Sequence, residues 1–167
     1  TVVWSDDRNG LYNASTGASV KTNGDNVVSS SGNGTTWSRP LVIGTPQDEF
    51  FSAVTTLDDK VAITSYTRHY DPSGINLDYA YWSASGTRSL GRAATQRITT
   101  ESENPQVQFL SVLPNGTELQ GVFIGDYSAV AIGADLRIHP SWTDFRGRPG
   151  VNTPNQDAYT QSIQLRR

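Results

Sequence analysis

The sequence predicts an all-β fold, and three observations lead to that expectation. Helical periodicity is nearly absent, because no apolar stripe recurs at i, i+3, i+4 and i+7 over even three turns. Short segments rich in Val, Ile, Thr, Tyr and Trp alternate with Gly, Asp and Asn turns along the chain. One stretch also repeats another in register, which is typical of folds that stack similar units.

The expected strands are short and each is bounded by turn residues. The first three are rich in Val and Ile, the next two flank an Asp-Asp turn, and the later ones combine β-branched and aromatic residues. In chain order they cover 1–4, 26–30, 40–43, 50–57, 60–66, 79–83, 118–124, 128–132, 137–142 and 158–165.

An internal repeat organises these strands into units. The stretch FSAVTTLDDKVAITSYT at 51–67 aligns without a gap on YSAVAIGADLRIHPSWT at 127–143. The pentapeptides WSDDR at 4–8 and WTDFR at 142–146 then mark the end of the second strand of a unit, and the first strand of the earliest unit is expected before Thr1. The expected units are about 1–48, 49–124 and 125–167.

Units of this kind predict a β-propeller of four-stranded antiparallel blades. Propellers close with about 4–8 blades, so three units make about half of a six-bladed ring and a single partial domain. Exposed blade edges and faces need cover, which predicts docking to a missing N-terminal portion of the same propeller or self-association. A β-sandwich is the alternative, since the same alternation supports it.

Composition removes several classes of function. The net charge is −3 and the 13 Lys and Arg are scattered, which argues against a nucleic-acid partner. No run of 18 apolar residues exists, so no membrane span is expected, and there is no Cys for a disulfide or a thiol nucleophile. His69 and His139 lack ligand-spaced partners, so neither a metal site nor a cofactor is expected. Sequons at Asn13, Asn33 and Asn115 are compatible with secretion.

The stretch SSGNGTTW at 30–37 resembles the Asp-box of sialidase-like propellers. Ser30, Gly34, Thr36 and Trp37 match that motif, and Gly32 stands where its Asp would be. We expect a tight turn over 30–34 and Trp37 packed in the body of a blade. Most of 104–165 also resembles the C-terminal blades of secreted sialidase-like, BNR-repeat glycosidases, which implies a secreted, extracellular protein.

The resemblance implies a set of catalytic and substrate-binding residues. Sialidases bind the substrate carboxylate with three arginines and use a tyrosine nucleophile activated by a glutamate, with an aspartate as acid/base. Tyr127 in GDYSAV falls at the nucleophile position with Asp126 beside it, and Arg8, Arg68 and Arg146 end second strands. No Glu is placed by a motif to activate the tyrosine, and the acid/base Asp and the first arginine belong to a portion that precedes this sequence.

Each candidate also has a structural interpretation. The partner of Tyr127 in the repeat is Phe51, so packing explains an aromatic there, and Asp126 at a strand start is typical of a turn cap. Asp144 with Arg146 fits either a sugar contact or an ion pair within the unit. Three further candidates for binding substrate are Tyr66, Arg68 and His69, of which the last two break the repeat and therefore favour function.

The sequence thus predicts a carbohydrate-active propeller that acts on terminal sugars of glycans, with a glycan or small sugar as its ligand. The alternative is a non-catalytic propeller that binds glycans or proteins. Whether the chain is a glycoside hydrolase stays open at this point.

Overall fold

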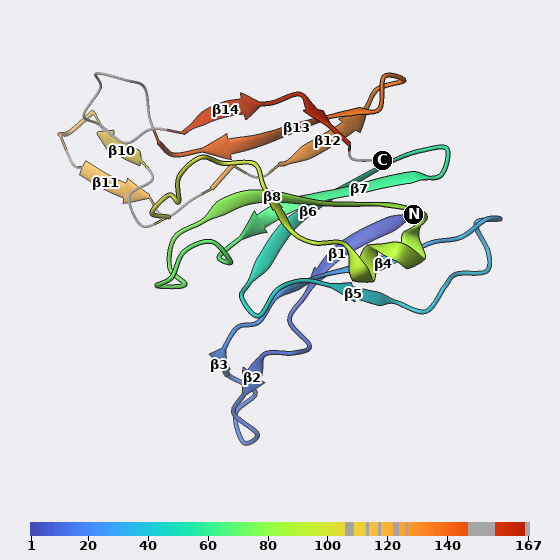
Figure 1. Cartoon of the computed structure of the whole chain (residues 1–167). Coiled ribbons are helices and arrows are strands. Elements are labelled where there is room, and N and C mark those ends of the chain that lie inside the picture. Colours follow the sequence, from blue (N-terminus) through green and yellow to red (C-terminus); the bar gives the residue numbers. More distant parts are fainter. Residues whose placement is uncertain are drawn as a thin grey trace.

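The all-β expectation is confirmed by the fold of the chain (Figure 1). A computed structural model describes residues 1–105, 109–112, 114–116, 118–121, 124–125, 127–146 and 156–165. Strands make up 46% of the chain and helix 4%, the helix being the short 3-10 turn η1 (Thr87–Arg92). No helix in the described ranges has both the length and the apolar character needed to cross a membrane.

The strands are short and follow one another closely along the chain. In order they are β1 (Val2–Asp6), β2 (Leu11–Tyr12), β3 (Ser19–Lys21), β4 (Asp25–Ser29), β5 (Leu41–Ile43), β6 (Glu49–Leu57), β7 (Lys60–Thr67), β8 (Asp78–Ser85), β9 (Gln96–Arg97), β10 (Phe109–Val112), β11 (Glu118–Gly121), β12 (Ala129–Ile132), β13 (Arg137–Asp144), β14 (Asp157–Thr160) and β15 (Ile163–Gln164).

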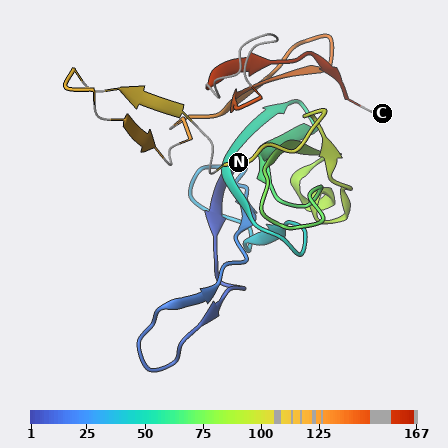
Figure 2. The same cartoon turned by 90° about the vertical axis from the view of Figure 1, so that its left-hand side faces the viewer.

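The strands form antiparallel sheets, none of which is closed. The first main sheet has the order β1-β4-β5, the second is the meander β6-β7-β8-β9, and in the third β13 pairs with β12, β14 and β15. These three sheets lie in layers with the meander in the middle, and the hairpin β2-β3 projects away from them (Figures 1 and 2). This arrangement is compatible with a β-sandwich, so the structure establishes an all-β fold at this level.

The two copies of the internal repeat form equivalent hairpins with different turns. Leu57 pairs with Lys60 across a two-residue turn, whereas Gly133 N donates to Arg137 O around a three-residue turn. Because of the longer turn, Val130 pairs with Pro140, one residue beyond the partner that the gapless alignment predicts.

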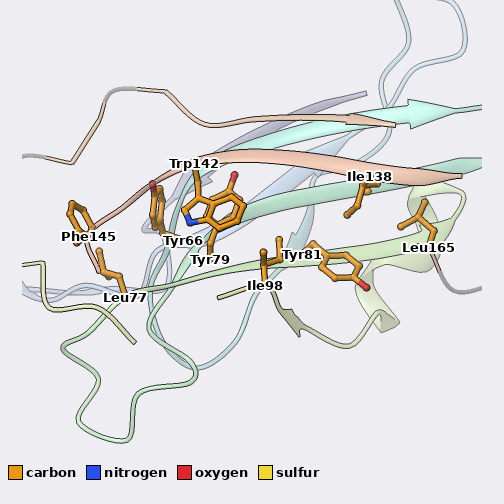
Figure 3. Packing of buried hydrophobic residues seen from close by; sticks show 10 residues of the cluster. Tyr66, Leu77, Tyr79, Tyr81, Ile98, Ile138, Trp142, Phe145 and Leu165 are labelled. Carbon is orange, nitrogen blue, oxygen red and sulfur yellow. The ribbon is translucent and has the colours of Figure 1, made fainter. Parts of the chain in front are cut away.

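The core lies on both faces of the middle sheet. Between the middle and third sheets, the ring of Trp142 stacks on that of Tyr79 at 5.1 Å between centroids (Figure 3). On the same face the Tyr66 hydroxyl donates to Thr143 O at 2.8 Å and accepts from Thr143 N at 2.9 Å. The opposite face packs against the first sheet through Val28, Ile43, Val61, Ile63, Trp82 and Leu90.

The serine of the repeated Ser-Ala-Val connects neighbouring sheets. Ser52 Oγ donates to Asn26 Oδ1 of the first sheet at 2.5 Å and lies 3.1 Å from Ser5 Oγ. Ser128 Oγ donates to Phe51 O of the middle sheet at 2.6 Å. Each copy is therefore tied by the same residue type to the sheet that precedes it.

The loop that resembles an Asp-box bends at residues 32–36, slightly later than the turn expected at 30–34. Asn33 Oδ1 accepts from Thr35 N and Thr36 N, and Gly34 has a φ of 75°, which favours glycine. The expectation that Trp37 packs in the body of a blade was wrong, because the residue is 46% exposed. Hydrogen bonds within the turn stabilise the conformation of the loop, so burial of the Trp37 side chain is not required for it.

Candidate functional site

The repeated pentapeptide forms the same arginine fork in two sheets. At the end of β13, Arg146 Nε and Nη2 donate to the two oxygens of Asp144 at 2.7 and 2.6 Å, and Trp142 Nε1 donates to the same carboxylate at 3.2 Å. At the end of β1, Arg8 and Trp4 contact Asp6 in the same pattern. Bidentate pairs of this kind fix a guanidinium in one geometry, so the repetition of the motif has a structural cause.

The two forks differ in their surroundings. Asp144 is fully buried, and although burial opposes ionisation, hydrogen bonds from Arg146 and Glu103 hold its pKa below the ordinary value. Arg146 also lies over the ring of Tyr159 at 4.8 Å. In the exposed fork, the hydrogen bonds from Arg8 lower the pKa of Asp6.

The middle sheet lacks this fork, and Arg68 stands at the position of its aspartate. In the gapless alignment Arg68 corresponds to Asp144 and Tyr70 to Arg146. Arg68 Nη1 donates to Gly74 O at 3.2 Å, while Nε lies 3.7 Å from Asp48 Oδ2 and is buried without a hydrogen-bond acceptor in the described part of the chain. Arg68 therefore keeps donor capacity that the forked arginines have used.

Arg68 lines a cleft of about 350 Å³ where the first and middle sheets meet. Four segments meet at this point (Figure 1). The strands β1 and β7 run in the same direction and end here, while their antiparallel partners β4 and β6 begin here. The lining residues are Ser5, Asp6, Asp7, Thr22, Gly24, Asp48, Glu49, Phe50 and Arg68. Phe50 stacks on Tyr66 at 5.5 Å and supplies an apolar wall.

Two of the acids in the cleft hold the segment before β4. Asp48 accepts from Gly24 N at 3.0 Å and from Thr22 Oγ1 at 2.7 Å. Asp7 accepts from Asn23 N at 2.5 Å and, through its other oxygen, from the hydroxyl of Tyr12 in the projecting hairpin at 2.6 Å. The walls of the cleft are thus fixed before any ligand enters.

Glu49 is a fully buried acid in the lining. Its carboxylate accepts from Thr45 Oγ1 at 2.6 Å and from Thr67 Oγ1 at 2.9 Å. Burial outweighs these hydrogen bonds and raises the pKa of Glu49 to about 7. A Cβ at Gly44 would lie 2.2 Å from Asp25 Oδ1 and 2.7 Å from Glu49 Oε2, so a side chain there would force one or both carboxyl groups to move.

The loop that follows β7 fixes Arg68 from the other side. Asp71 accepts hydrogen bonds from Ser73, Ile75 N and Asn76 N, and these lower its pKa. The same loop presents Gly74 O to Arg68. A braced loop of this kind holds the guanidinium at the cleft.

The other predicted residues lie around this site or away from it. His69 follows Arg68 and packs on Tyr70 at 4.9 Å between ring centroids, and Tyr66 is buried with its hydroxyl on Thr143, where burial raises its pKa. Tyr127 is 88% exposed and does not line the cleft.

Asp126 lies outside the described residues. Arg8, Arg68 and Arg146 follow the ends of β1, β7 and β13, which lie toward the same side of the stacked sheets (Figure 1), but each has its own carboxylate neighbour.

The sequence reasoning missed the acids and the aromatic residue that complete the cleft. Asp48, Glu49 and Phe50 stand together just before and at the start of a strand, and Asp7 follows the first pentapeptide. The sequence feature that could have identified them is the acidic pair Asp48-Glu49 at the start of a predicted strand, because that strand start lies at the same end of the sheets as Arg68. Among the residues that the structure describes, no three His, Asp or Glu side chains are grouped to hold a metal.

No protein-family model, curated protein or solved structure matches the chain.

Proposed function

We propose that the chain is part of a carbohydrate-binding β-propeller and that the cleft beside Arg68 holds one sugar residue of a glycan. The propeller part is supported by the four-stranded meander β6-β7-β8-β9 and by the fork that recurs at the ends of β1 and β13. It is also supported by the contacts of β6 with β1 on one side and with β12 on the other. Neighbouring blades make contacts of this kind.

The observation that carries the binding proposal is the free donor capacity of Arg68. Arg8 and Arg146 each direct two nitrogens onto one carboxylate. Among the described residues the Arg68 side chain makes one hydrogen bond, to Gly74 O, and it is one-third exposed at the cleft. A ligand that brings oxygen acceptors satisfies this guanidinium, and a buried donor without an acceptor is costly in its absence.

The remaining lining groups fit a hydroxyl-rich ligand. The carboxylates of Asp6, Asp7 and Asp48 accept hydrogen bonds from hydroxyl groups, and the Phe50 ring offers an apolar surface to the C–H face of a sugar. A volume of about 350 Å³ is at the lower end of small-molecule sites and suits a single sugar unit.

The geometry favours binding over sialoside hydrolysis. A sialidase needs several arginines free to hold one carboxylate, but Arg8 and Arg146 are already forked onto Asp6 and Asp144. Tyr127, the predicted nucleophile, is exposed and outside the cleft lining. Binding without turnover is therefore the better-supported reading of this site.

Titration with a fixed panel of sugars tests the proposal. Methyl galactoside, N-acetylglucosamine and 3′-sialyllactose are added to the 167-residue chain, and backbone amide shifts and calorimetric heats are recorded. We expect saturable shifts at the cleft with at least one sugar and a loss of about 10- to 100-fold in affinity in Arg68→Gln, as for one or two charge-assisted hydrogen bonds. Arg137→Gln is the matched control, because that arginine bonds Ser162 at the other end of β13.

The outcomes separate the two functions. No saturable shift with any sugar, or equal losses in the two variants, would contradict glycan binding at this cleft. Release of the fluorophore from a fluorogenic sialoside, abolished by Tyr127→Phe, would replace it with the sialidase function.

A further inference from the structure

A second hollow, of about 390 Å³, lies at the opposite end of the sheets from the cleft. In the β1-β4 register Asp6 pairs with Asp25 at the cleft end, while Val2 pairs with Ser29 at the hollow end. The end of β4, the start of β5 and the start of η1 form its walls. The lining residues are Val28, Ser29, Ser30, Ser38, Arg39, Pro40, Leu41, Thr87 and Arg88.

The two arginines of this hollow lie at the surface without a carboxylate partner among the described residues, unlike the arginines at the cleft end. In the part of the chain that the structure describes, Arg8, Arg68, Arg97 and Arg146 each lie against a carboxylate. Arg39 and Arg88 have neither an ion pair nor a hydrogen bond among the described residues, and no acid is in the lining. Two unneutralised guanidinium groups therefore share one hollow in a chain with a net charge of −3.

Hydrogen bonds fix the segments that carry these arginines. Ser30 Oγ lies 2.9 Å from Thr87 Oγ1, which joins the end of β4 to the residue before Arg88. Ser38 N donates to Ser30 O and Ser29 Oγ donates to Ser38 O, both at 2.9 Å, which fixes the residue before Arg39. Because both backbones are held in advance, little ordering of the chain opposes binding.

We propose that this hollow is a second binding site, for an oxyanion carried by an organic ligand. The planar donors of a guanidinium match sulfate, phosphate and carboxylate groups, and two guanidinium groups bind such a group more strongly than one. The serine and threonine hydroxyls add donors, and Val28, Pro40 and Leu41 give the organic body an apolar surface. This site is independent of the sugar cleft, with which it shares no residue.

The test compares anion probes at constant ionic strength. Glucose 6-sulfate, glucose 6-phosphate and glucuronate are titrated against the chain, with glucose, inorganic sulfate and inorganic phosphate alongside, while the Nε–Hε resonances of the arginines are followed by NMR. We expect saturable shifts at Arg39 and Arg88 with at least one sugar-borne anion and none with glucose. The double variant Arg39→Gln/Arg88→Gln should bind that probe at least ten-fold more weakly.

Matched variants keep the proposal falsifiable. Arg92→Gln removes an exposed arginine of the same 3-10 helix outside the hollow and should leave affinity unchanged. Arg68→Gln should also leave it unchanged, so a failure here is distinguishable from a failure of the sugar cleft. Equal losses in Arg92→Gln would show a diffuse charge effect, and inorganic anions binding as tightly as the sugar-borne ones would show a site for free ions. Either result, or the absence of saturable shifts, overturns the proposal.

Discussion

At the scale of single residues, the same Trp-x-Asp-x-Arg fork performs the same task in two environments. Asp144 is fully buried beneath Arg146 and Trp142, whereas Asp6 and Arg8 lie at the surface. Ion pairs at a protein surface contribute little because water and salt screen them. When one partner of a buried ion pair is removed, the remaining charge stays buried without an opposite charge beside it, which is strongly destabilising.

Asp144→Asn is therefore expected to destabilise the chain by about 3 kcal/mol, since it removes the charge that compensates Arg146 and disrupts the fork. Urea unfolding of this variant measures the loss, and Asp6→Asn is the control that should lose much less. Equal losses in the two variants would contradict a difference in burial between the forks.

The sequence led to Arg68 for a physical reason that the structure supports. A residue that departs from a repeat does not make the structural contact that the repeated residue makes. Arg68 stands at the position of the fork's aspartate, and its side chain lines the cleft instead. Tyr127 was predicted as the nucleophile from the resemblance of one short stretch of sequence. Such a resemblance gives the position of a residue along the chain but not the residues that surround it in space. Asp48 and Glu49 reach the cleft from a different strand, so local patterns in the sequence did not pair them with Arg68.

At the scale of elements, Tyr66 links β7 to β13 through two hydrogen bonds to Thr143. Tyr66→Phe removes the hydroxyl and leaves the Thr143 amide without its partner, which should cost about 1–3 kcal/mol in urea unfolding. Tyr159→Phe is the control, because that ring lies near Trp142 while its hydroxyl makes no hydrogen bond among the described residues. A Tyr66→Phe variant as stable as the parent chain would show that the two strands do not meet in this way.

Glu103 connects the segment after β9 to the end of β13 and makes stability depend on pH. Its backbone bonds Leu77, and its carboxyl accepts from Phe145 N at 2.8 Å and lies 3.5 Å from Arg146. Burial first, and then the neighbouring Asp144, raise the pKa of Glu103 to about 8. In the unfolded chain the pKa returns to about 4.3.

The folded state therefore holds a proton on Glu103 that the unfolded state releases. This contribution to the free energy of unfolding is complete below about pH 4 and is lost as the pH rises through about 8. Urea unfolding between pH 5 and 9 should show falling stability, and Glu103→Gln should flatten the profile because an amide does not titrate. Glu49, with a pKa raised to about 7, adds a slope of the same sign, so the difference between the two profiles is the measurement. Parallel profiles would contradict the assignment to Glu103.

The long strands were predictable from the sequence, and the short ones were not. The hairpin of β6 and β7 follows from Thr, Val and Ile on either side of Asp58-Asp59. The two-residue strand β9 is defined by its pairing with β8, and the hairpin β2-β3 consists of exposed residues without a buried face. Elements of this kind depend on their partners and leave no periodic pattern in the chain.

At the scale of the whole molecule, the two hollows differ in their charged groups. The cleft is lined by Asp6, Asp7, Asp48 and Glu49 together with Arg68, whereas the second hollow is lined by Arg39 and Arg88 without an acid. Since the two hollows share no residue, the variants at Arg68 and at Arg39 and Arg88 should each weaken binding at one of them and leave the other unchanged.

The outer face of the first sheet carries a row of apolar side chains. In a propeller this face would pack against a neighbouring blade. Trp4, Val27 and Val42 are direct cross-strand neighbours on β1, β4 and β5; Val27 at the centre is already buried, whereas Val42 at the edge is 39% exposed. Val2 lies two residues from Trp4 on the same face and is 42% exposed. A blade buries each face against a neighbour, so the propeller proposal predicts that a second copy of the chain covers this row.

Light scattering coupled to size-exclusion chromatography should therefore report a mass above 18.2 kDa for the chain. Val42→Glu places a charge in the row and should shift the population toward the monomer, because a buried charge without a partner opposes association. Val20→Glu is the control, since Val20 is 69% exposed on the projecting hairpin and should leave the mass unchanged. A monomer at all concentrations would mean that no second copy covers the row, and a self-contained β-sandwich would then explain the three layers better than a set of blades.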